Sequence, residues 1–193
     1  MKIVLTMFVI VGLTTSGLYA QMSGGLRAGL NLGSGEVSND TESESFDGKV
    51  GFQAGGYFIA NFNEHFAIQP ELVYSHTRVT YMEADLDFGY IAVPLYLRYT
   101  INKMFNVHAG PQASFLMSAH AEMQGSGTDV KDYFTSTDLG ASFGAGVDFG
   151  KFNAAFRYYI SLSNIADDSY FPNDAKWKYN NFQLVVGYRL FGE

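Results

Sequence analysis

The stretch YIAVPLYLRYTINKMFNVHAGPQASFLM, residues 90–117, alternates between two kinds of side chain. Every second position from Ile91 to Ile101 is apolar except Tyr99, whereas the positions between them carry Arg98 near their middle. After a short break the alternation resumes and runs from Val107 to Met117. Strict period-two alternation over ten or more residues is longer than soluble strands usually run. The stretch therefore predicts two long strands whose faces meet different surroundings.

The same alternation recurs along the rest of the chain, and no segment has a convincing 3.6-residue period, so the sequence predicts an all-β domain. Tight connections that contain Asn or Gly alternate with longer links, as in a meander of hairpins. The expected strands are 23–32, 49–62, 65–77, 87–101, 104–118, 137–149, 152–163 and 180–191. The expected long links are 33–48, 78–86, 119–136 and 164–179. This layout predicts an eight-stranded antiparallel up-and-down transmembrane β-barrel with short periplasmic turns and long external loops.

The size of the side chains predicts which face of each strand is inside. Eight strands enclose an interior just wide enough for side chains to fill, and the bulky apolar residues are too many for it. The other face carries small and polar residues such as Gly144 and Gln69. We therefore expect the bulky face to meet lipid. It includes Phe52, Phe58, Phe62, Phe66, Ile68, Leu72, Tyr74, Ile91, Val93, Leu95, Leu97, Phe115, Leu139, Phe143, Val147, Phe152, Phe156, Leu184, Val186 and Tyr188.

Charged residues of the strands share the small polar face. An arginine on the lipid face of a barrel costs about 2–4 kcal/mol at the bilayer midplane, so these arginines should turn inward and pair. The predicted lumen charge network is Arg27, Glu71, Arg98, Asp138, Asp148, Arg157 and Arg189. The network could be the selectivity lining of a channel or a salt-bridged plug. Eight strands close tightly, which favours the plug.

Aromatic residues and prolines add two further expectations. Aromatic rings near strand ends predict girdles at the membrane interfaces. They are Phe62, Phe66, Tyr74, Tyr99, Phe105, Phe149, Phe152, Tyr158 and Tyr188. Pro70, Pro94 and Pro111 fall inside strands, where each removes a ladder donor, so we expect bulges or local bends there.

The N-terminus predicts export. Lys2 precedes an apolar run from Ile3 to Leu13, and small residues lead to Ala20, which predicts a cleaved signal peptide over 1–20 and a barrel domain over 21–193. The absence of cysteine excludes disulfides, a lipoprotein anchor and cysteine-ligated metals. A net charge of −7 argues against a nucleic-acid partner.

Most acidic residues fall in or beside the long links. The candidate external-loop contacts among them are Glu36, Asp40, Glu42, Glu44, Asp167, Asp168 and Asp174. Such loops could hold Ca²⁺ weakly, but they lack EF-hand spacing, so a solvated acidic rim is the better interpretation. The sequence thus predicts no metal and no cofactor.

Candidate chemistry is sparse. Nucleophilic catalysis needs a base within hydrogen-bond reach of the nucleophile. His108 has inward parity, and Ser114 lies six residues along the same face, about 20 Å away at 3.4 Å per residue. His108 is therefore expected to be a hydrogen-bonding group of the lumen. The segment GSGTD (125–129) lacks the lysine of a P-loop and is interpreted as a linker.

Several segments resemble one known family. GLRAGLNLG, GFQAGGYF, FAIQPELVYS, YIAVPLYLRY, FNVHAGPQASFLMSA, GASFGAGVDFG and FQLVVGYRL are similar to the PorT-like outer-membrane β-barrel domain family, in the expected order. The resemblance implies an eight-stranded barrel in the outer membrane and implies no particular activity. Outer-membrane barrels commonly end on an aromatic residue. This sequence departs from that pattern, because Gly192 and Glu193 follow the aromatic Phe191.

The function expected from these features is a structural or loop-mediated binding role at the cell surface. The expected molecule is a monomer that contacts outer-membrane lipid, the barrel-assembly machinery and an extracellular or envelope protein. A small-solute pore, an accessory component of a secretion apparatus, a lipid-active enzyme and a soluble ligand-binding barrel remain alternatives.

Overall fold

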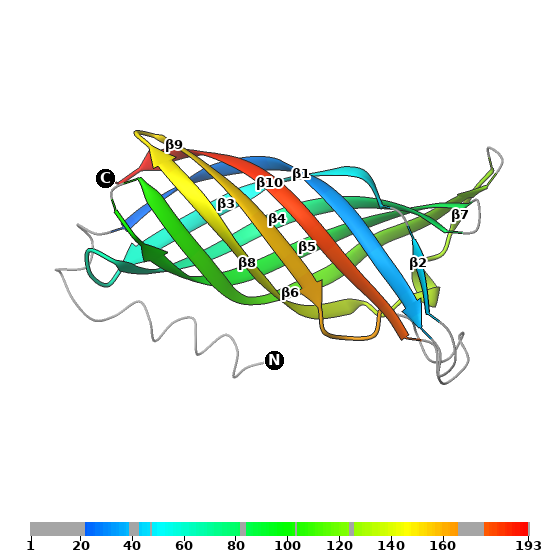
Figure 1. Cartoon of the computed structure of the whole chain (residues 1–193). Helices are drawn as coiled ribbons and strands as arrows, with labels where there is room; N and C mark the ends of the chain where they lie inside the picture. Colours follow the sequence, from blue (N-terminus) through cyan, green and yellow to red (C-terminus); the bar gives the residue numbers. More distant parts are fainter. Residues whose placement is uncertain are drawn as a thin grey trace, which may run out of the picture.

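The protein folds into one closed antiparallel β-barrel, seen here in a computed structural model (Figure 1). The structure describes residues 22–38, 43–46, 48–81, 84–102, 104–123, 126–165 and 176–192. The barrel strands are β1 (Met22–Ser38), β3 (Gly48–Asn61), β4 (Phe66–Tyr81), β5 (Ala84–Thr100), β6 (Phe105–Met123), β8 (Thr137–Phe149), β9 (Phe152–Ser161) and β10 (Lys176–Phe191). Pairing of β10 with β1 closes the sheet, which confirms the predicted eight-stranded meander. Within these ranges no helix is long and apolar enough to cross a membrane.

The two ends of the barrel differ in how well the sequence predicted them. At one end the connections β3–β4, β5–β6 and β8–β9 are short, and their strand ends lie within one or two residues of the expected positions. We call this the tight-turn end and the opposite one the long-loop end. At the long-loop end several strands run on past the expected limits. β4 continues to Tyr81 and β5 starts at Ala84, so the predicted long link over 78–86 is wrong.

Two short strands and one helical turn, which the sequence did not predict, add to the long-loop end. β2 (Ser43–Phe46) pairs with β1 beyond the part of β1 that pairs with β3. β7 (Ser126–Asp129) pairs with β6 beyond the part of β6 that pairs with β8. The 3₁₀ turn η2 (Lys131–Tyr133) follows β7. Figure 1 shows β2 and β7 at the end opposite the C-terminus.

The orientation of the strand faces agrees with the expectation. Leu95 is 43 % exposed on the outside, whereas Arg98 on the same strand is 8 % exposed and points inward. All but three of the bulky residues expected to face lipid are exposed large hydrophobics; Phe58, Ile68 and Ile91 are partly buried. Apolar side chains cover the outside of β4 from Phe66 to Tyr74 and of β5 from Ile91 to Tyr99. Nine residues in each strand match the roughly 9–11 that a membrane-spanning strand needs. We call this outer apolar zone the belt.

Aromatic rings border the belt as expected. Near the tight turns, Phe66 packs against Tyr99 with ring centroids 5.1 Å apart, and Phe152 packs against Tyr188 at the same distance. Phe62, Phe105 and Phe149 are also exposed beside these turns. Towards the other end, Tyr158 lies 4.5 Å from Phe182.

The prolines interrupt the ladders without shifting the register. Pro70, Pro94 and Pro111 each lie in a gap of two residue pairs, in the β3–β4, β4–β5 and β5–β6 ladders respectively, and the register is the same on both sides of each gap. A missing N–H accounts for each gap. Bulges at the prolines are therefore a wrong prediction. The register shifts that do occur lie at Gly24/Gly25, Lys49/Phe52 and Gly89/Tyr90.

Candidate functional site

The centre of the lumen is an ion cluster that joins three strands from different parts of the barrel wall. Glu71 on β4 accepts hydrogen bonds from Arg27 on β1 and Arg157 on β9. Both bonds from Arg157 measure 2.9 Å. These three side chains are almost inaccessible to solvent, with 0–2 % exposed. Two guanidinium groups thus share one carboxylate, and we call this set the central cluster.

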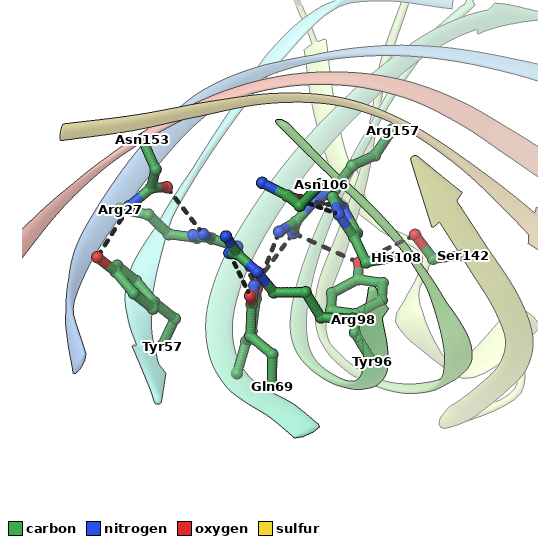
Figure 2. Close-up of polar contacts among 11 residues, drawn as sticks. Arg27, Tyr57, Gln69, Tyr96, Arg98, Asn106, His108, Ser142, Asn153 and Arg157 are labelled. Atoms are coloured by element: carbon green, nitrogen blue, oxygen red, sulfur yellow. Dashed lines mark hydrogen bonds and ion pairs between the residues drawn. The ribbon is translucent and has the colours of Figure 1, made fainter. Parts of the chain in front are cut away.

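Polar and aromatic neighbours hold Arg157 in place. Its Nε donates to His108 Nε2 over 2.9 Å, and its guanidinium carbon lies 4.5 Å from the centre of the Tyr96 ring. Gly144 lies between His108 and Arg157 across the sheet, and a Cβ there would come within 2.8 Å of the Arg157 side chain. Figure 2 shows Arg157, His108 and Tyr96 converging in this way. His108 is thus the lumen hydrogen-bonding group that its parity predicted.

Arg27 is held from the side of the tight-turn end. Its guanidinium carbon lies 4.6 Å from the centre of the Tyr57 ring, and its Nη2 donates to Asn153 Oδ1 over 3.2 Å (Figure 2). Asn153 in turn donates to the Tyr57 hydroxyl over 2.8 Å. Sequence reasoning missed Tyr57, Tyr96 and Asn153, although inward parity on their strands was a usable signal.

A second ion pair lies nearer the tight-turn end. Arg98 donates to Asp148 and, over 3.2 Å, to Gln69 Oε1. Gln69 Nε2 donates to Glu71 Oε1 over 2.6 Å, which links this pair to the central cluster. Asn106 also donates to Asp148, over 2.9 Å.

The other two members of the expected charge network stand apart. Asp138 is buried towards the long-loop end, where its carboxylate accepts hydrogen bonds from the hydroxyls of Tyr159, Ser161 and Ser163 at 2.6–2.8 Å. Arg189 lies at the tight-turn end and donates to the Gly150 carbonyl over 2.6 Å. The structure therefore brings five of the seven residues into one linked set and places Asp138 and Arg189 outside it.

Apolar side chains fill the lumen at the long-loop end, where the sequence led us to expect polar ones. The buried residues Val79, Leu86, Phe88, Tyr90, Leu116, Ala119, Phe134 and Ile165 form one cluster, which we call the cap. Phe134, from the segment after η2, meets the Phe88 ring edge-on at 4.9 Å. Between the cap and the central cluster lies a cavity of only about 20 Å³. That volume is close to the minimum for a single water molecule.

Outside the cap the strand surfaces are charged. Lys49 Nζ donates to Asp85 over 2.5–2.6 Å, and Arg78 donates to Asp87. These groups lie beyond the belt. Hydrogen bonds from the Lys49 ammonium and the Thr80 hydroxyl hold the pKa of Asp85 below its usual value.

The candidate loop contacts are only partly placed. Glu36 and Glu44 lie on the paired strands β1 and β2 at the long-loop end. Asp40, Glu42, Asp167, Asp168 and Asp174 lie outside the described residues, as does the expected signal peptide 1–20. Within the described ranges, no group of three or more His, Cys, Asp or Glu side chains could hold a metal ion.

Solved structures with the same architecture are outer-membrane barrels. Ail, the attachment invasion locus protein of Yersinia pestis, superposes with a TM-score of 0.51 at 18 % identity, covering 88 % of this chain and 99 % of that one. Neisserial surface protein A superposes with a TM-score of 0.54 at 13 % identity, covering 86 % and 97 %. No curated protein matches the chain significantly. The outer membrane protein β-barrel domain family matches residues 19–167, most of the sequence, and the chain belongs to that family of the bacterial outer membrane.

Proposed function

We propose that this protein is a closed scaffold that presents its long-loop end to a protein partner at the cell surface. The observation that supports this role most is the double closure of the lumen. The central cluster blocks the middle of the barrel, and the cap fills the long-loop end. Solute transport through such a lumen would require both layers to rearrange. The part free to act on the outside is then the surface of the strand extensions and loops.

The partner we propose carries a basic patch. The acidic residues that fall in or beside the predicted long links of the sequence are Glu36, Asp40, Glu42, Glu44, Asp47, Glu83, Asp85, Asp87, Glu122, Asp129, Asp132, Asp167, Asp168 and Asp174. Opposite charge would steer a basic protein to the long-loop end. One structure of Ail contains the heparin analogue sucrose octasulfate. An acidic rim would repel such a polyanion, so we propose a different ligand for this chain.

Membership of the PorT-like branch and export through a signal peptide cleaved after Ala20 are parts of the same proposal. The motifs QPEL, AVPLYLRY and AGPQ support the branch, and the apolar run from Ile3 to Leu13 supports export. We also propose a non-enzymatic monomer. His108 contacts the central cluster, and its Nε2 already accepts a hydrogen bond from Arg157, so it is not positioned to act as a base through that nitrogen.

Three experiments test this function. In planar bilayers the purified barrel should give no discrete conductance steps, and a stable open channel would favour the small-solute pore instead. Partners should be recovered from gently solubilised envelopes with the intact chain and lost with a chain that lacks residues 36–47. Unchanged recovery would remove the first loop as the docking site. Hydrolysis of labelled lipid that is lost in His108→Ala would favour the enzyme.

A further inference from the structure

A cavity opens at the tight-turn end and extends into the lumen as far as the central cluster. Its volume is about 330 Å³. We call it the vestibule; its lining includes Tyr57, Arg98, Asp148, Lys151, Asn153 and Arg189. Arg27 lies behind Tyr57 and Asn153, so the inner wall of the vestibule adjoins the central cluster. Short turns face the periplasm in barrels of this kind, so solutes would reach the vestibule from the periplasm.

The charges that line the vestibule do not balance. Asp148 is the only acid among the lining residues, and Arg98 pairs with it. Lys151 and Arg189 form no ion pair within the described part of the chain. Glu64 lies in the β3–β4 turn at the same end but is not part of the lining. Among the residues that the structure describes, Lys151 and Arg189 are thus two cationic groups of the vestibule without a counter-charge.

Among the hydrogen-bonding groups of the lining, free donors outnumber free acceptors. Asp148 already accepts bonds from Arg98 and Asn106. The Tyr57 hydroxyl accepts a bond from Asn153, which leaves its own proton free to donate. Arg189 donates from Nη2 to the Gly150 carbonyl and keeps further donors on its guanidinium. A lining rich in donors and poor in free acceptors suits an oxyanion.

The central cluster behind the inner wall strengthens the positive electrostatic field inside the vestibule. Behind its inner wall, two arginines share the single carboxylate of Glu71, which adds one more uncompensated positive charge. A cavity of one sign with low-dielectric walls focuses the field and concentrates counter-ions. We propose that the vestibule is a binding site for a phosphate group, carried either by a small periplasmic phosphate or by a phospholipid headgroup. Its volume lies at the lower end of the range for small-molecule pockets, which suits one such group.

The test uses the full chain refolded in uncharged detergent and titrated with inorganic phosphate by calorimetry at low ionic strength. We expect saturable binding that Lys151→Gln weakens about tenfold, as does Arg189→Gln, because each removes one charge-assisted hydrogen bond. Lys49→Gln is the matched control, since Lys49 lies at the opposite end and pairs with Asp85. Lys151 is exposed in the β8–β9 turn, so its replacement should not disturb folding. Absence of saturable binding, or equal affinity in the wild type and Lys151→Gln, would overturn the proposal.

A second arm separates the two sources of phosphate. The same titration is repeated in nanodiscs made from phosphatidylcholine alone or with added phosphatidylglycerol. Competition by the anionic lipid, seen as a fall of tenfold or more in phosphate affinity, identifies a headgroup site. Affinity in both nanodiscs equal to that in uncharged detergent identifies a site for soluble phosphate, whereas an equal fall in both identifies a site for the phosphate of either headgroup.

Discussion

The belt and the strand extensions at the long-loop end use the same alternation with opposite polarity. In the belt, β4 points Leu72 outward and Glu71 inward. A few residues further along the same strand, Arg78 points outward and Val79 inward. The surroundings explain the reversal, because lipid meets the outside of the belt whereas water meets the outside of the extensions. An extension therefore buries apolar side chains in its interior, as a soluble barrel does.

Inside the belt the buried groups are charged, and the central cluster is where this interior can be tested with the largest expected effect. Replacing Glu71 with Ala leaves two arginines buried without their carboxylate, and we expect a loss of about 3–5 kcal/mol in the free energy of unfolding. Urea titration in lipid vesicles, followed by circular dichroism, measures it. Replacing Arg27, Glu71 and Arg157 together with Met should restore most of the loss, because no buried charge remains. A loss below about 1 kcal/mol in Glu71→Ala would mean that the cluster is not buried as described.

The same charged side chain should have different costs on the outside of the two regions. Leu95→Arg places a charge in the belt and should cost about 2–4 kcal/mol. His120→Arg places it on the exposed outside of the β6 extension and should change stability by no more than about 0.5 kcal/mol. The same urea titration measures both variants. Equal costs for the two would contradict the boundary between the regions.

The interior of the extension should behave as an apolar core. Val79 is 1 % exposed within the cap, and Val79→Ala removes two buried methyl groups. We expect a cost of about 1.5–2 kcal/mol from lost burial and the cavity left behind. Protease sensitivity at the long-loop end should rise as well, since the cap holds Phe134 there. An unchanged digestion pattern together with unchanged stability would argue against a packed cap.

The smallest expected effect concerns the exposed pair of Lys49 and Asp85. Because the pKa of Asp85 is lower in the folded protein, its contribution to stability is present above the unfolded-state pKa and lost as the pH falls through the folded-state pKa. Asp85→Asn should therefore be slightly less stable than the wild type at pH 7 and equally stable at strongly acidic pH. Thermal midpoints across this pH range measure the difference. A difference that grows towards acid would have the wrong sign.

The sequence predicted the belt well because one rule governs it throughout. Alternation assigned Leu95 to lipid and Arg98 to the lumen, and the Asn- and Gly-containing turns placed the strand ends at the tight-turn end. The extensions were assigned to loops because their outward charges, such as Arg78 and Asp85, resemble loop residues once apolar-outward polarity is assumed. The extensions still alternate with a period of two residues. They can be predicted as strands if polar residues are allowed to face outward and apolar residues inward there.

The lumen contacts were predictable only in part. Parity alone shows that Arg27, Glu71 and Arg157 point inward, but their strands are not neighbours in the sheet. Which of them meet depends on the stagger of the strands around the barrel, and that stagger is a property of the closed sheet. For the same reason Asp138 was expected to pair with arginine, whereas the stagger brings it to the hydroxyls of Tyr159, Ser161 and Ser163.

The most direct test of the reversal uses spin labels on one strand. One label replaces Leu95 and another replaces Asp87, both on the outside of β5, in the protein reconstituted in bilayers. Collision rates with oxygen, which concentrates in lipid, and with a water-soluble nickel complex report the surroundings of each label. The reversal of polarity predicts oxygen-dominated collisions at position 95 and nickel-dominated collisions at position 87. Nickel-dominated collisions at position 95, or oxygen-dominated collisions at position 87, would contradict it.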